Sequence, residues 1–128
     1  MFADYRFDSA TPLYWQLMAL IRRRIVAGEW RAGQRVPPVR DLAAEFGVNP
    51  NTMQRALSEL EREGLLYSER TAGRYITWDA ALIAAARDQL AREQTADFRR
   101  RMAAMGYSDE EMIALLRAAG ADDGSDDG

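Results

Sequence analysis

Apolar residues recur at helical spacing in three stretches of the first half of the chain. The first stretch covers residues 12–27: Thr11 suits the N-cap position before it, and Gly28 suits the position after its end. Its apolar positions are Tyr14, Leu17, Met18, Ile21 and Ile25. Because these positions are three or four residues apart, they share one face, and the pattern predicts a single amphipathic helix.

Two shorter stretches with the same spacing follow, over residues 38–46 and 50–63. Their apolar positions are Val39, Leu42, Ala43 and Phe46 in the first and Met53, Ala56, Leu57 and Leu60 in the second. A turn with Gly47 and Asn49 lies between them, and Asn49 is a good N-cap residue ahead of Pro50. Two short helices joined by a tight turn predict a helix-turn-helix, although a helical hairpin of another bundle has the same pattern.

Residues that favour β-structure replace the helical pattern after Gly64. Residues 65–69 predict a strand, residues 70–73 a turn and residues 74–78 a returning strand. One more short strand is a candidate at Arg35 and Val36. A hairpin directly after a helix-turn-helix is the wing of a winged helix, so the predicted fold class is mainly α with a small β-hairpin.

A long helical pattern covers residues 79–105, and Gly106 ends it. Gln94 interrupts its apolar face, which comprises Ile83, Ala86, Leu90, Phe98, Met102 and Met105. A shorter helix is predicted from Ser108, with Glu111 three residues later in the spacing of a capping box. Its apolar positions are Met112, Ile113, Leu115 and Leu116.

Three regions follow from these elements. Residues 1–78 are predicted to form a winged helix-turn-helix, and residues 79–119 a C-terminal segment of two helices. Gly120 is expected to end the last helix, so that residues 120–128, which are rich in Asp, form a disordered acidic tail.

The apolar faces of the two C-terminal helices need a partner, either a second copy of the chain or the chain's own winged helix. A two-helix appendage cannot bury its stripe alone, and operator half-sites are usually read by two-fold dimers, so a homodimer is favoured. The residues expected at the dimerisation contact are Ile83, Leu90, Phe98, Met102, Met105, Ile113 and Leu116.

The chain contains neither Cys nor His, which narrows the functions that the fold can carry. Disulfides and Cys-ligated zinc are excluded and the commonest general base is missing, so a small enzyme is disfavoured. The acidic tail lacks the spacing of an EF-hand, and we predict no catalytic residue, metal site or cofactor. No run of 18 apolar residues is present and the first residues do not resemble a signal peptide, so a cytoplasmic protein without membrane contact is expected.

The net charge of −3 is unusual for a DNA-binding protein, but the charge is unevenly distributed. Residues 1–78 hold 11 Arg and 9 acidic residues, whereas residues 79–128 hold 6 Arg and 11 acidic residues. Every basic residue is Arg, which suits bidentate contacts with phosphate and guanine. The negative net charge favours one alternative, a winged-helix module that binds proteins and not DNA.

The stretch from Pro12 to Thr77 resembles the DNA-binding domain of GntR transcriptional regulators. The resemblance rests on the opening PLYWQL, the Pro-x-x-Arg-x-Leu-Ala at 37–43, the Asn-Thr followed by Ala-Leu at 51–57, and the Glu-x-Glu-Gly-Leu at 61–65. With 50 residues after the wing, an Asn-Pro-Asn-Thr opening and a Gly-Tyr-Ser run at 106–108, the chain is similar to the short YtrA-type subfamily. This resemblance implies a transcriptional repressor that dimerises through its C-terminal helices.

The third predicted helix carries polar residues on the face opposite its apolar positions. In a helix-turn-helix, the N-terminal part of this helix reads base edges in the major groove. Asn and Gln suit adenine and Thr suits a thymine methyl group or a phosphate, although any solvated helix face is also polar. The residues expected to contact DNA here are Asn49, Asn51, Thr52, Gln54, Arg55 and Ser58.

Two further groups of residues are expected at the DNA. The resemblance implies that Arg40, in the second helix, contacts DNA. A wing tip commonly reaches the minor groove or flanking phosphates, and a plain exposed hairpin turn is the alternative. The wing-tip residues are Arg70, Thr71, Gly73 and Arg74. Many GntR proteins carry Arg where this chain has Pro50 and Gln54, so the resemblance does not imply an operator sequence. The chain is short for a dedicated sensor domain, and a small-molecule effector, for which a dimer crevice offers a place, is unknown from the sequence.

Overall fold

The structure is a computed structural model that describes residue 7 and residues 11–126 of the 128-residue chain. It contains two compact units, Met1–Asp88 and Gln89–Gly128, and each is described by itself. The boundary between them falls within helix α4 (Ala80–Ala104), ten residues after the predicted end of the DNA-binding domain. No helix among the described residues is long and apolar enough to span a membrane.

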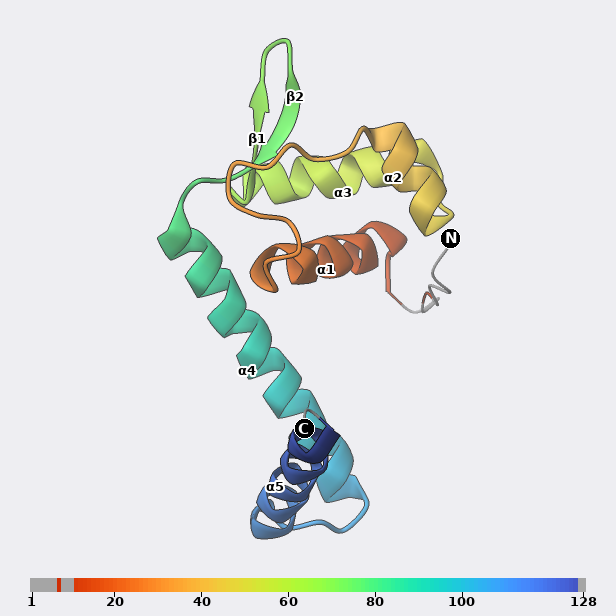
Figure 1. The fold of residues 1–128 in the computed structure, drawn as a ribbon. Coiled ribbons are helices and arrows are strands. Elements are labelled where there is room, and N and C mark those ends of the chain that lie inside the picture. Colours follow the sequence, from red (N-terminus) through yellow and green to blue (C-terminus); the bar gives the residue numbers. More distant parts are fainter. Residues whose placement is uncertain (1–6, 8–10, 127–128) are drawn as a thin grey trace. The chain divides into compact units, whose positions relative to one another are not determined.

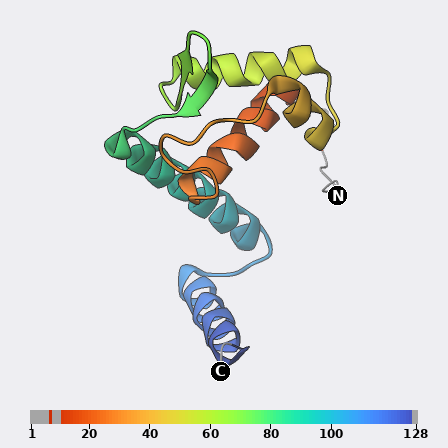
Figure 2. The same cartoon turned by 45° about the horizontal axis from the view of Figure 1, so that its top comes forward.

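The first unit has the predicted helix-turn-helix and hairpin (Figure 1). Its elements in chain order are α1 (Leu13–Val26), α2 (Val39–Phe46), α3 (Pro50–Arg62), β1 (Leu66–Glu69) and β2 (Gly73–Ile76). The two strands form an antiparallel pair, so the predicted fold class, mainly α with a small β-hairpin, is confirmed. Figures 1 and 2 show α1 beneath α3, with α2 near one end of α3 and the hairpin at the other.

One hydrophobic core holds the elements of the first unit together. Its fully buried side chains come from all three helices and both strands and comprise Leu17, Ile21, Leu42, Met53, Leu57, Leu60, Leu66 and Ile76. The apolar stripes predicted for the three helices are buried except for Tyr14 and Val39, which are half-buried at the edge of the core. Burial of one Leu, Ile or Met side chain contributes about 1.5–3 kcal/mol, so this cluster is a large part of the unit's stability.

The turn between α2 and α3 has the conformation that its sequence predicts. Gly47 ends α2 in the left-handed region with a φ of 69°, where glycine has no steric penalty. Asn49 then caps α3, because its side-chain oxygen accepts the Asn51 N–H over 2.7 Å. The predicted cap of α1 is wrong: Pro12, not Thr11, is the N-cap residue, because its extended ψ of 137° lets its own carbonyl accept the first helical N–H.

The loop before α2 runs beside the hairpin as a short extended segment. Arg35 forms a single β-bridge with Tyr75, and the Val36 N–H donates to the Arg74 carbonyl over 2.9 Å. The candidate strand at Arg35 and Val36 is therefore reduced to one bridge. Pro37 follows directly and has no N–H to donate, which prevents a longer ladder.

Trp78, just after β2, covers Gly33 of the same loop. A Cβ added to Gly33 would lie 2.0 Å from the Trp78 ring, so glycine permits this close approach. Gly33 also has a φ of 78°, a conformation that residues with a side chain disfavour. The indole N–H of Trp78 donates to the Tyr67 hydroxyl over 3.1 Å, and this bond holds the ring in place although Trp78 is 71% exposed.

Helix α4 contributes residues to both units. Its first turns belong to the first unit, where Leu82, Ile83 and Ala86 are half-buried against the core. The apolar pattern predicts Ile83 at the dimerisation contact. In the structure Ile83 packs against the core of the first unit of the same chain.

The second unit consists of the rest of α4 and helix α5 (Asp109–Asp126). The predicted capping box at the start of α5 is confirmed. The Ser108 N–H donates to the Glu111 carboxylate over 2.9 Å, and the Glu111 N–H donates to the Ser108 hydroxyl over 3.2 Å. The bonds from Ser108 favour the ionised carboxylate and lower the pKa of Glu111.

The predicted end of the last helix at Gly120 is wrong. Helix α5 continues through Gly120 to Asp126, and Gly120 lacks the positive φ that Gly106 has after α4. Glycine inside a helix costs about 1 kcal/mol relative to alanine, which weakens a helix without ending it. Residues 120–126, expected to be part of a disordered tail, are therefore helical, and residues 127–128 lie outside the described residues.

Candidate nucleic-acid interface

The outward face of α3 presents the polar residues that the sequence predicts to contact DNA. Asn51, Gln54, Arg55 and Ser58 are exposed, and Thr52 is half-buried. Four buried side chains fix the opposite face of the helix in the core: Met53, Ala56, Leu57 and Leu60. Because these anchors recur every three or four residues, they determine which face of α3 stays in solvent.

Asn49 has a structural role at this face, since it caps α3 ahead of Asn51. We expect Asn49→Ala to lower the free energy of unfolding by about 1 kcal/mol, because the substitution leaves the Asn51 N–H without its partner. Urea unfolding measures the change. Asn49→Ser, which retains an acceptor suited to the N-cap, is the matched control, and its free energy of unfolding should fall clearly less than that of Asn49→Ala. Equal losses in the two variants would contradict the capping role.

Arg55 is fixed by an aromatic ring on the α1 side of α3. Its guanidinium carbon lies 3.8 Å from the centroid of the Tyr14 ring. A guanidinium at this distance is attracted by the negative face of the ring. Arg55 is nevertheless exposed to solvent, so it stays a candidate for contact with a phosphate or a base.

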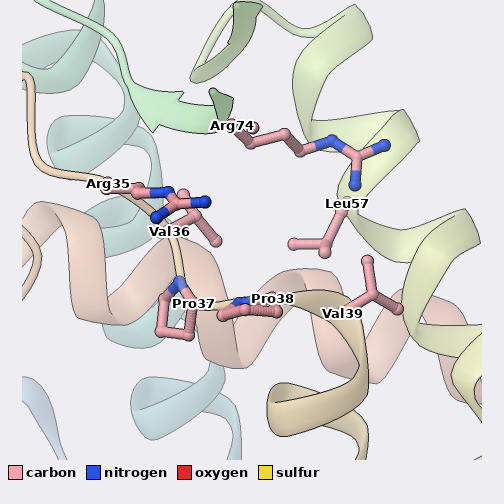
Figure 3. A pocket seen from close by; sticks show the side chains of 8 residues that line it. Arg35, Val36, Pro37, Pro38, Val39, Leu57 and Arg74 are labelled. Carbon is pink, nitrogen blue, oxygen red and sulfur yellow. The ribbon is translucent and has the colours of Figure 1, made fainter. Parts of the chain in front are cut away.

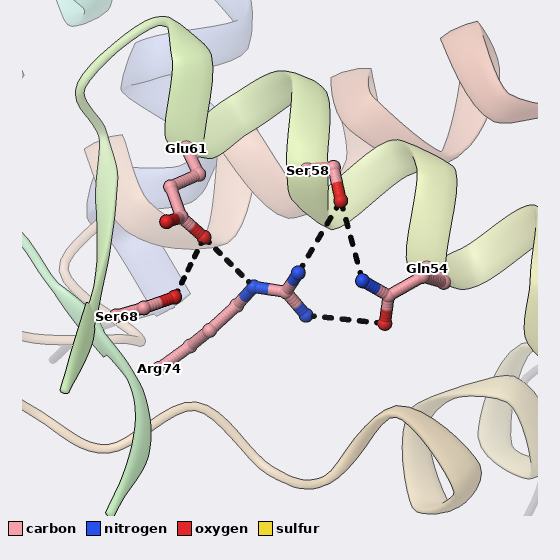
Figure 4. Close-up of polar contacts among 5 residues, drawn as sticks. All are labelled: Gln54, Ser58, Glu61, Ser68 and Arg74. Carbon is pink, nitrogen blue, oxygen red and sulfur yellow. Dashed lines mark hydrogen bonds and ion pairs between the residues drawn. The ribbon is translucent and has the colours of Figure 1, made fainter. Parts of the chain in front are cut away.

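Arg74 lies across the outward face of α3 and not at the wing tip (Figure 4). Its Nε donates to the Glu61 carboxylate over 3.0 Å, its Nη1 to the Gln54 amide oxygen over 3.4 Å and its Nη2 to the Ser58 hydroxyl over 3.3 Å. The predicted wing-tip position is wrong because side chains alternate along a strand. Arg74 is two residues before the buried Ile76 and therefore points to the same side, toward the helix.

Two more bonds complete this network. The Ser68 hydroxyl donates to the Glu61 carboxylate over 2.9 Å, and the Gln54 amide nitrogen donates to the Ser58 hydroxyl over 3.3 Å. Glu61 and Ser68 were missed as members of the site. The signal that could have found Glu61 is its spacing: it follows Gln54 by seven residues, two helical turns, and so shares its face of α3.

The hairpin tip holds three of the predicted wing residues. Arg70, Thr71 and Gly73 are all exposed, and Gly73 has a φ of 95°. A Cβ on Gly73 would lie 3.5 Å from the Arg35 guanidinium, which is an ordinary van der Waals contact, so a side chain would fit here. Glycine is favoured because of the positive φ of the backbone.

A hollow of about 200 Å³ lies between the loop before α2, the middle of α3 and the hairpin (Figure 3). The residues around it are Arg35, Val36, Pro37, Pro38, Val39, Leu57, Gly73 and Arg74. Figure 3 shows the side chains of Arg35 and Arg74 on the hairpin side of the hollow, with the two prolines and Val39 opposite. Arg35 is a further cation of this surface that the sequence pattern did not single out.

Three arginines around this surface are available to bind anions. Among the described residues, Arg35, Arg40 and Arg70 have no carboxylate within ion-pair distance. They come from the loop before α2, from α2 itself and from the hairpin turn, and all three are exposed. The surface therefore carries free positive charge although the whole chain has a net charge of −3.

The second unit has an apolar face that its two helices bury only in part. Met112 is buried, whereas Met105, Ile113 and Leu116 are 65%, 47% and 58% exposed. The other predicted dimerisation residues of this unit are half-buried, and they are Leu90, Phe98 and Met102.

A shallow groove of about 230 Å³ lies on this face between α4 and α5. Phe98 and Met112 line it together with the exposed Ile113 and Leu116. An ion pair between Arg99 and Asp109, 2.9 Å long, joins the two helices at the groove and raises the pKa of Arg99.

The family described as "Bacterial regulatory proteins, gntR family" matches residues 13–76, the stretch that contains α1, the helix-turn-helix and the hairpin. The chain belongs to the GntR family. The resemblance stated from the sequence motifs is thereby confirmed, and with it the winged-helix interpretation of the helical hairpin.

Two relatives within the GntR family come from Bacillus subtilis. The chain is 37% identical over 114 residues to the uncharacterized HTH-type transcriptional regulator YhcF. This match covers 89% of this chain and 94% of that protein. It is 39% identical over 72 residues to the HTH-type transcriptional repressor YtrA, and this match covers 56% of this chain and 55% of the repressor.

Solved structures of GntR proteins have the same fold. A GntR family transcriptional regulator from Listeria monocytogenes has a TM-score of 0.77 and 36% identity, over 88% of this chain and 98% of that one. AraR(DBD) in complex with operator ORX1 has a TM-score of 0.51 and 28% identity, over 60% of this chain and 93% of that one. As a GntR family member, the chain is a DNA-binding transcriptional regulator.

Proposed function

We propose that this GntR regulator represses transcription by binding a two-fold operator as a homodimer. The observation that carries the proposal is the polar face of α3, anchored by buried residues behind it and accompanied by three arginines without acidic partners. The similarity to a repressor supports the direction of regulation, and the similarity to a domain solved on its operator supports the docking mode. The proposed function is cytoplasmic DNA binding without a catalytic step.

In this proposal α3 enters the major groove and reads bases with its N-terminal turns. Asn51 and Gln54 are exposed amides, which pair with adenine through one donor and one acceptor. Thr52 offers a methyl group to thymine or a hydroxyl to a phosphate. Arg55 and Ser58 lie further along the same face and extend the contact.

The backbone of the operator is bound by the unpaired arginines. Arg40 is in the first turn of α2, where the free N–H groups of the helix also favour a phosphate. Arg35 and Arg70 provide further phosphate contacts, the first at the hollow of Figure 3 and the second at the hairpin turn. Thr71 and Gly73 bring the wing backbone close to the minor groove.

The partly exposed apolar face of the second unit pairs with the same face of a second copy. Ile113 and Leu116 would be covered in the dimer, and Met105 with them. A symmetric contact of this kind places two α3 helices on two half-sites, which is the usual arrangement of helix-turn-helix dimers.

The proposal is tested by titration of the promoter of the protein's own gene at several salt concentrations. Phosphate contacts release counterions, so the logarithm of the binding constant should fall linearly with the logarithm of salt, by about 0.9 per neutralised phosphate. Footprinting on the same DNA should protect two half-sites. Binding that is independent of salt, or no protected site, contradicts DNA recognition by this surface.

Replacement of Arg40 by Ala should reduce the salt slope by about one unit and weaken binding to operator and unrelated DNA alike, because the lost contact is with a phosphate. Fluorescence anisotropy at four or more salt concentrations measures both quantities. Arg117→Ala, an exposed position on α5 with the same change of charge, is the control and should leave the slope unchanged. An unaltered slope in Arg40→Ala removes Arg40 from the interface.

A further inference from the structure

We propose that Glu61 restrains Arg74 so that Arg74 positions Gln54 for base recognition and does not bind a phosphate. This inference rests on the proposed reading of DNA by α3 and identifies what sets its specificity. Glu61 and Gln54 are on α3, and Arg74 is on β2. A residue of the wing would therefore orient a base-reading residue of α3 through contacts within the protein.

The bonds of Arg74 fix its guanidinium at three points. A guanidinium has five N–H groups in a rigid planar fork, and three of them are used on Glu61, Gln54 and Ser58. The shortest of the three bonds, at 3.0 Å, is the ion pair with Glu61, which also accepts a bond from Ser68. Glu61 on α3 therefore accepts bonds from both strands of the hairpin, from Ser68 on β1 and from Arg74 on β2.

The Arg74 side chain is 18% exposed, and it lies between two hollows of the surface. Its side chain borders the hollow of Figure 3 on one side and, on the other, an open polar depression with Ser58, Glu61, Arg62 and Ser68. Of the three bonds that hold Arg74 over α3, the one with Glu61 is the shortest and the only ion pair, so its removal weakens the restraint most. The two hollows that Arg74 lines then give the side chain space to turn toward DNA.

The restraint decides which way the Gln54 amide points. Arginine has only donors, so the amide oxygen of Gln54 must face Arg74, and its nitrogen then donates to Ser58. The second lone pair of that oxygen and the second N–H of that nitrogen remain for a base, in a fixed order. Adenine offers a donor and an acceptor side by side, and a preset amide meets them without a rotation.

Glu61 has an electrostatic cost on a surface that meets a polyanion. It adds a negative charge beside α3 and neutralises one of the arginines there. Such a residue weakens attraction to nearby phosphates whatever the base sequence, whereas an oriented Gln54 favours one base. Together the two effects raise the ratio of specific to non-specific binding, which matters more in a genome than affinity alone.

The first test is Glu61→Ala. With Arg74 released, the salt slope for unrelated DNA should steepen by about one unit, as expected for one added phosphate contact. The preference for the native base at the Gln54 position should fall, measured by competition with operators altered at each base pair. Glu63→Ala is the matched control: it makes the same change of charge and breaks an ion pair with Arg22 of 2.7 Å. Glu63→Ala should neither steepen the salt slope for unrelated DNA by one unit nor reduce the base preference at the Gln54 position.

Arg74→Lys is the second variant, and it decides the question if Glu61→Ala does not fold. Lysine keeps the charge but has no planar fork to bond three partners at once. The base preference at the Gln54 position should fall toward that of Gln54→Ala, for which a loss of about 5- to 150-fold is expected from one bidentate contact. Adding Gln54→Ala to Arg74→Lys should then change this preference by less than about twofold.

Asn51→Ala separates a failure of this inference from a failure of the proposed function. Asn51 lies on α3 outside the Arg74 network, so its replacement should relax specificity at another base pair. If Asn51→Ala and Gln54→Ala relax specificity while Glu61→Ala and Arg74→Lys leave it intact, the restraint is refuted and α3 remains the reader. If none of the four alters base preference, both the proposed function and this inference fail.

Discussion

Charging the apolar face of the second unit, with Ile113→Glu plus Leu116→Glu, should weaken binding to a two-half-site operator by about 100-fold or more. The two side chains are 47% and 58% exposed, so the substitutions should leave the protomer folded. In a dimer they would place four like charges in an apolar contact, and the pair would separate. Each protomer then binds its half-site alone and loses the high effective concentration that a linked partner provides.

Light scattering alongside DNA titration measures this effect. The wild type should have twice the protomer mass of 14.4 kDa, and the double variant that mass itself. Ala114→Glu plus Ala118→Glu is the matched control, because it adds the same two charges to exposed positions on the other side of α5. A variant that remains dimeric, or a wild type that is monomeric at micromolar concentration, contradicts the assembly proposed here.

Leu60→Ala should lower the free energy of unfolding by about 2–5 kcal/mol, the range for a leucine removed from a well-packed core. Leu60 is completely buried on the inner face of α3. Folded domains of this size have a total stability of about 5–15 kcal/mol, so the loss is a large part of it. Since the same core sets the orientation of the reading face, operator binding should fail at temperatures where the wild type is still folded.

Urea unfolding followed by tryptophan fluorescence checks this value. Leu115→Ala makes the same change at a helix position that is 44% exposed, and it should cost less than about 1 kcal/mol. Similar costs at the two positions would mean that the buried anchors of α3 do not carry the stability assigned to them.

The helices of the first unit could be predicted because the residues that determine them are close together in the sequence. Apolar positions three and four residues apart determine which side of each helix is buried, and a cap residue such as Asn49 marks where a helix starts. The exposed polar face of α3 follows from the same periodicity. The exposed residues Asn51, Gln54 and Ser58 are therefore found without knowledge of the fold.

The contacts of Arg74 could not be predicted from the same pattern because they depend on distant parts of the chain. Arg74 is 13 residues from Glu61 and 20 from Gln54, and only the packing of the hairpin on α3 brings them together. Helix ends were also hard to place. Gly120 and Gly106 have the same side chain, yet only Gly106 adopts a positive φ and ends its helix.

The indole ring over Gly33 gives this protein an optical reporter of its own wing. Trp78 donates to the Tyr67 hydroxyl and its ring lies against Gly33, so its fluorescence should change if either contact is lost. Trp15 and Trp30 lie on α1 and in the core, and replacing both with Phe leaves a single emitter at the base of the hairpin. Arrival of the wing at DNA can then be timed by stopped flow, without attaching a dye to either molecule.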